Sequence, residues 1–132
     1  MTKWLNSLQP FGALCMRLAL GISMAVHGYG KVIPHGALNH HAHYVASLGI
    51  PYWFGYVSAW TEFAGGILLI LGLLTRFAAA FIAINLFVAL IFVGIHQGSG
   101  VYNYLLALIA LALMLTFYGA GILALDRKIG VS

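Results

Sequence analysis

The stretch WTEFAGGILLILGLLTR, residues 60–76, places the carboxylate of Glu62 inside an otherwise apolar run. The chain contains only one other acidic residue, Asp126. Such a run predicts a membrane-spanning helix, because a bilayer core about 30 Å thick needs roughly 20 apolar residues per helical crossing. An ionisable side chain in that setting has to face the protein interior, water or a polar partner. The stretch therefore predicts both a spanning helix and a buried partner for Glu62.

The whole chain has the composition of an integral membrane protein. Of its 132 residues, 63% are hydrophobic and 6% are charged, whereas soluble domains carry about 25% charged residues. Four helical crossings would occupy most of this length. We therefore expect one domain over residues 1–132, with an all-α fold made of a four-transmembrane-helix bundle. The six Lys and Arg residues are spread along the chain without a basic cluster, so nucleic acid is not an expected partner.

Breaks in the apolar sequence place the four spans. We expect the first helix to end at the HGYGK segment, where Gly28 and Gly30 would break it before Lys31 returns the chain to water. A long polar connection follows, and a short interfacial helix is predicted within it over residues 39–48. The predicted spanning helices cover residues 11–27, 53–74, 77–95 and 101–125.

The distribution of positive charge predicts the orientation. Lys3, Arg76, Arg127 and Lys128 fall on one side of the predicted bundle and Lys31 falls on the other. Because cytoplasmic loops of membrane proteins are enriched in Lys and Arg, we expect both termini to be cytoplasmic. The expected location is the inner (plasma) membrane of a bacterium.

Three polar side chains are predicted to meet near the middle of the bilayer. Arg17 and Glu62 each lie about ten residues from the expected outer ends of their helices, which corresponds to a depth of about 15 Å. Asn85 reaches the same layer from the opposite side. We therefore expect a salt bridge between Arg17 and Glu62, with Asn85 as a third member.

Two interpretations of this layer stay open. In the first, it is a structural polar clamp that fixes the register of the helices, since buried ion pairs alone are weak evidence of function. In the second, it lines a small-molecule pocket in which Arg17 donates to a carbonyl or anion and Glu62 accepts a proton.

A second polar layer is expected near the outer face, and it adds His27 and Lys31 to the candidate ligand-binding residues. His27 and His96 stand on separate predicted helices and could ligate haem iron or another metal, but interfacial histidines are common and we expect neither. His40, His41 and His43 are packed too closely for a standard zinc spacing. We expect these three in a solvated loop. The candidate ligand-binding residues are Arg17, Glu62, Asn85, His27 and Lys31.

Several short motifs follow one another along nearly the whole chain. They are Arg17 with Gly21, HGYGK at 27–31, GIP at 49–51, Glu62 with Gly65 and Gly66, LGLLTR at 71–76, and the closing segment from Gly119 to Asp126. Their order and spacing resemble the DoxX family of small four-helix membrane proteins. The chain departs from many relatives early in the fourth helix, where Asn103 stands in place of an acidic residue.

The resemblance implies a membrane subunit that hands electrons to quinone, as in a thiosulfate:quinone oxidoreductase. In that hypothesis the cofactor is quinone, and Arg17, Glu62 and His27 lie near its headgroup. Other members of the family look like partner or assembly subunits, so a non-enzymatic membrane partner with a structural Arg–Glu pair is the alternative. Expected partners are the lipid bilayer, a membrane or redox protein, and a second copy of the chain. Transport of a small solute is a third, weaker hypothesis.

Overall fold

The computed structural model describes residues 2–130, and within this range every regular element is a helix. Four of the helices are long and apolar enough to cross a membrane: α2, α4, α5 with η1, and α6. The predicted all-α fold with four spanning helices is confirmed. In chain order the elements are α1 Thr2–Ser7, α2 Gln9–Val32, α3 Ala37–Ser47, α4 Tyr52–Leu71, α5 Thr75–Phe92, η1 Gly94–His96, α6 Ser99–Tyr118 and α7 Leu125–Ile129.

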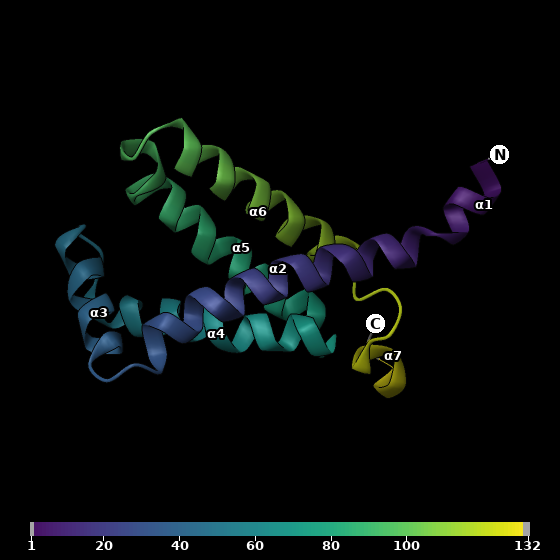
Figure 1. Ribbon diagram of the computed structural model, residues 1–132, viewed down its shortest axis with the longest axis horizontal. Coiled ribbons are helices and arrows are strands. Elements are labelled where there is room, and N and C mark those ends of the chain that lie inside the picture. The colour runs from purple at the N-terminus through teal and green to yellow at the C-terminus, as the bar shows by residue number, and fades with distance from the viewer. Residues whose placement is uncertain (1, 131–132) are drawn as a thin grey trace.

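The spanning helices pack as two pairs, α2 with α4 and α5 with α6 (Figure 1). Contacts between α4 and α5 join the pairs, and α3 packs against α4 and α2. The short helix predicted over residues 39–48 is therefore present as α3. Both ends of the described chain lie at the opposite end of the bundle from α3 (Figure 1). Which side of the membrane that end faces stays a prediction.

Small residues bring α2 and α4 into close contact. A Cβ atom at Gly21 would lie 2.9 Å from the carbonyl oxygen of Gly66, and one at Gly28 would overlap the backbone of Phe63. Helices approach this closely in membranes where small residues line the contact. The predicted end of the first helix at Gly28 and Gly30 is wrong, because α2 continues to Val32. Gly28 does not end the helix, and its missing side chain allows the close contact with α4.

The fourth spanning helix is shorter than predicted. We expected it to run to residue 125, but α6 ends at Tyr118. Gly119, Gly121 and Leu123 adopt positive φ angles of 99°, 76° and 52°, a backbone conformation that ends a helix and that glycine adopts at low cost. After α6 the chain is irregular over residues 119–124 and then enters α7. We call residues 119–126 the C-terminal segment.

This C-terminal segment closes one end of the bundle. The guanidinium of Arg17 donates to the carbonyl oxygens of Ala120 and Leu123 at 3.0 and 2.8 Å. The carboxylate of Asp126 accepts from the backbone N–H groups of Leu74 and Thr75 at 2.6 and 2.8 Å. These two N–H groups lie at the start of α5 and have no partner within that helix. A distant part of the chain therefore caps α5.

Candidate functional site

The predicted salt bridge between Arg17 and Glu62 is wrong. Gly28 packs against Phe63 in the middle of α4, whereas Arg17 lies beside Gly72, directly after the C-terminal end of α4. Ten residues of helix separate positions 62 and 72, which corresponds to about 15 Å. The depth estimate assumed that the first helix ended at residue 27 and faced a helix beginning near residue 53. Two observations contradict that assumption: α2 runs on to Val32, about one and a half turns beyond residue 27, and Gly28 rather than Arg17 lies level with Phe63.

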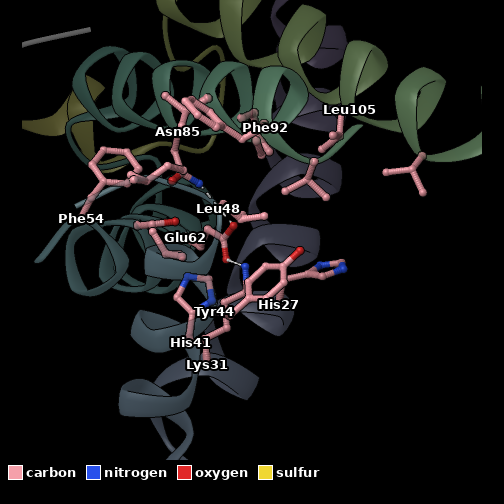
Figure 2. A pocket seen from close by; sticks show the side chains of 18 of the residues that line it. His27, Lys31, His41, Tyr44, Leu48, Phe54, Glu62, Asn85, Phe92 and Leu105 are labelled. Carbon is pink, nitrogen blue, oxygen red and sulfur yellow. Dashed lines mark hydrogen bonds and ion pairs between the residues drawn. The ribbon is translucent and has the colours of Figure 1, made fainter. Parts of the chain in front are cut away.

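Glu62 instead has two partners from two other helices. The ammonium of Lys31 on α2 donates to Oε2 at 2.6 Å, and the side-chain amide of Asn85 on α5 donates to Oε1 at 3.2 Å (Figure 2). Glu62 is 6% exposed, whereas the Lys31 side chain is 32% exposed. A buried carboxylate with a cationic partner and an amide donor has the contacts that offset the loss of hydration. The predicted meeting of Glu62 with Asn85 is therefore observed.

A cavity of about 430 Å³ opens beside this carboxylate, and we call it the inner cavity. Its walls come from α2, α3, α4, α5 and α6 and are mostly apolar. Figure 2 shows Lys31 and His41 on one side of Glu62, and Phe92 and Leu105 on the other. The volume lies within the roughly 300–1,000 Å³ of small-molecule sites, which combine apolar walls with a few polar groups. The arrangement can therefore hold a largely apolar molecule with a polar end.

The inner cavity brings together four of the five predicted site residues. His27, Lys31, Glu62 and Asn85 line it, and Arg17 does not. The Nδ1–H of His27 donates to the carbonyl oxygen of Ser23 at 2.7 Å, because a carbonyl can only accept. In the neutral ring this leaves Nε2 of His27 as an acceptor. Arg17 belongs to the contacts of the C-terminal segment.

His27 and His96, the two histidines considered as metal ligands, do not line the same cavity. His96 lies in η1 and does not line the inner cavity. Across residues 2–130, no three His, Cys, Asp or Glu side chains are grouped so that they could hold a metal ion.

His41 is a site residue that the sequence analysis missed. We expected its side chain to be solvated, but it lines the inner cavity, and its Nε2 atom is buried without a hydrogen-bond partner in the protein. The signal was present in the spacing, because His41 shares one helical face with Tyr44, Val45 and Leu48, and all four line the cavity. Burial lowers the pKa of His41, the charge of Lys31 acts in the same direction, and Glu62 opposes it.

This pKa shift predicts how stability responds to acid. The folded protein holds His41 neutral at pH values where the unfolded chain, with a pKa near 6.5, takes up a proton. The unfolded state then binds more protons, so His41 makes stability fall as pH drops below about 6.5 towards the lowered pKa. We expect His41→Gln to lose less thermal stability than the wild type between about pH 7.5 and about pH 5. Melting temperatures in mild detergent measure this effect.

His40→Gln is the matched control, because His40 precedes His41 on α3, is exposed and does not line the inner cavity. Its melting temperature should follow the wild-type pH profile. Equal acid sensitivity of the wild type and His41→Gln would contradict the assignment of this shift to His41.

Comparison with known proteins shows the family of this chain. The model of the DoxX family matches residues 12–95. This chain belongs to the DoxX family. The match runs from within α2 to within η1, so it includes Lys31, His41, Glu62 and Asn85. The Asp126 contact, which closes the other end of this DoxX protein, lies outside the matched range.

One curated relative covers nearly the whole of the DoxX chain. It is a Bacillus subtilis (strain 168) protein named "Putative oxidoreductase CatD", and it is 34% identical over 125 residues. The alignment covers 92% of this chain and 90% of that protein. No solved structure matches the chain.

Proposed function

We propose that this DoxX-family protein is a quinone-linked redox membrane subunit whose inner cavity receives the quinone headgroup. The observation that carries the proposal is the Glu62–Lys31 ion pair on the wall of a largely apolar cavity of about 430 Å³. The name of the Bacillus relative supports a redox role in general terms. We also propose that the protein lies in the bacterial inner membrane with both termini in the cytoplasm.

The residues of the inner cavity fit the chemistry of a quinone. A quinone headgroup is a flat ring with two carbonyl oxygens that can only accept hydrogen bonds, and its isoprenoid tail is apolar. Lys31 has three N–H donors, one of which is directed at Glu62. The Nε2 atom of His41 has no protein partner. Apolar side chains such as Phe54, Leu86 and Leu108 would contact the ring and tail.

Each polar residue has a separate task in this proposal. A bound quinone supplies a group that takes up two electrons and two protons. Lys31 would donate to a carbonyl oxygen and orient the ring. Glu62 would hold or release a proton at its carboxylate, and Asn85 keeps that carboxylate in place through Oε1. The sequence has a single cysteine and no glycine-rich dinucleotide motif, so the electrons would come from a partner protein or from a cofactor bound with it.

The Glu62→Gln variant tests the proposal. Glutamine keeps the shape and the acceptor for Asn85, and Lys31 is exposed enough to find water, so the bundle should still fold. The negative charge that holds Lys31 in place is lost. We expect binding of a short-chain quinone analogue, measured by titration in mild detergent, to weaken at least about 10-fold, which corresponds to about 1.4 kcal/mol.

Asn103→Ala is the matched control, since Asn103 is exposed on α6 and does not line the inner cavity. It should bind the analogue like the wild type. Full-strength binding by Glu62→Gln would contradict the proposed site. Wild-type protein that binds no quinone and co-purifies with a membrane protein would favour the non-enzymatic partner subunit instead.

A further inference from the structure

A second cavity lies against the first and has a different character. It has a volume of about 610 Å³ and we call it the outer cavity. Neither Glu62 nor Asn85 lines it. Its wall is formed by the end of α2, the turn that follows and one side of α3. It consists of Gly30, Lys31, His35, Gly36, Ala37, His40, His41 and Tyr44.

Three residues line both cavities: Lys31, His41 and Tyr44. They form a dividing wall between the buried carboxylate of Glu62 and the outer cavity. A proton that passes between Glu62 and the outer cavity by this route has to cross the wall. The chemistry of these side chains therefore decides which of them can carry it.

Only the imidazole of His41 can both accept and donate a proton near neutral pH. The ammonium of Lys31 is paired with Glu62 and has no acceptor. Tyr44 supplies a single phenolic hydroxyl, which donates or accepts hydrogen bonds. An imidazole has an ordinary pKa of about 6.5 and two ring nitrogens that can exchange protons on opposite sides.

The surroundings of His41 leave its ring able to accept a proton. The charged and titratable groups that influence it are Lys31 from α2, Glu62 from α4, and His40 on its own helix. Tyr44 stands one turn further along α3. Burial and the charge of Lys31 lower the pKa of His41, so the ring is neutral and able to accept a proton at neutral pH. Its buried Nε2 has no hydrogen bond to another protein group that a transfer would have to break.

We propose that His41 relays protons between the water of the outer cavity and the carboxylate of Glu62. In the inward direction, one ring nitrogen takes a proton from water and the ring becomes an imidazolium. The other nitrogen then gives a proton to Glu62, directly or through one water molecule, which leaves a neutral imidazole and a neutral carboxylic acid. Release follows the reverse order, and no electrons move. As the route by which protons reach a quinone, the relay rests on the proposed function.

The test measures the protonation of Glu62 in purified protein without quinone. After a rapid drop in pH, stopped-flow infrared spectroscopy follows the appearance of the protonated carboxyl band. The chain has only two acidic side chains, so the band missing from Glu62→Gln identifies the signal of Glu62. We expect His41→Ala to slow this protonation by about 100-fold, the size of effect that a positioned proton-transfer group supplies.

Imidazole added to the buffer separates a relay from a structural role. It is small enough for the outer cavity, and we expect it to restore the protonation rate of His41→Ala with a saturable concentration dependence. His40→Ala should protonate Glu62 at the wild-type rate, because His40 lines only the outer cavity. A structural defect would not respond to imidazole.

Two results would overturn the relay. One is a wild-type rate of Glu62 protonation in His41→Ala, and the other is a slow rate that imidazole does not change. Both measurements are independent of quinone. A confirmed relay in a protein that binds no quinone would remove the proposed function alone, whereas quinone binding without any effect of His41 on protonation would remove the relay alone.

Discussion

Replacing Gly28 by alanine is expected to lower the free energy of unfolding by about 3 kcal/mol, the upper range for inserting a methyl group into a fully packed contact. The new Cβ atom would overlap the backbone of Phe63, which cannot rotate away as a side chain could. Helices α2 and α4 would have to separate along their contact. Thermal unfolding in mild detergent measures the loss.

The same displacement should reach the candidate site. Lys31 follows Gly28 by less than one turn of α2, and Glu62 precedes Phe63 on α4. Separating the two helices therefore lengthens the distance between the ammonium and the carboxylate. We expect Gly28→Ala to bind a quinone analogue more weakly than the wild type, in addition to being less stable.

Gly30→Ala is the control for this prediction. Gly30 lies on the same helix two residues later, and no atom lies within 4 Å of the position that its Cβ would take. Alanine is favoured over glycine in a helix by about 1 kcal/mol, so this variant should be as stable as the wild type or more stable. If Gly28→Ala and Gly30→Ala unfold at the same temperature, the close contact at Gly28 does not hold the bundle together.

The second large effect is expected at Asp126. Its carboxylate oxygens accept the backbone N–H groups of Leu74 and Thr75, and the residue is 2% exposed. In Asp126→Asn one acceptor becomes an N–H₂ donor that faces a backbone donor. Hydrogen bonds to charged groups contribute about 1.5–3 kcal/mol, so we expect the free energy of unfolding to fall by about 2–3 kcal/mol.

This loss should be local to the end of the bundle formed by the C-terminal segment. Hydrogen exchange at the backbone amides of Leu74 and Thr75 is expected to become faster, because their acceptor is lost. Arg127→Ala changes the next residue, which is exposed, and should leave both stability and exchange unchanged. Wild-type exchange at Leu74 and Thr75 in Asp126→Asn would show that the carboxylate is dispensable as a cap.

Much of the architecture could be predicted from the sequence. Spanning helices are a local property, since about 20 apolar residues are needed wherever the chain crosses a bilayer. The burial of Glu62 followed in the same way, because a lone acid in an apolar helix needs a polar surrounding. Asn85 was correctly placed beside it from its depth on the third spanning helix. The short helix α3 was predicted from its apolar face.

The partners of the charged residues could not be predicted in this way. Pairing Arg17 with Glu62 required the relative position of two helices, which the hydropathy of each helix does not contain. That position is set by the contacts of Gly28 with Phe63 and of Gly21 with Gly66. They place Lys31, which we had assigned only to the outer polar layer, at the carboxylate. They also leave Arg17 at the other end of the bundle.

The amino-acid sequence by itself therefore determined that the chain is a four-helix membrane protein with an acid buried among its helices. The tertiary structure alone decided that Lys31 neutralises this acid, that His41 stands between it and the outer cavity, and that Asp126 caps α5. The physical reason is the range of the interactions. Hydrophobic length acts within one helix, whereas ion pairs, cavity walls and distant caps depend on how backbones pack against one another.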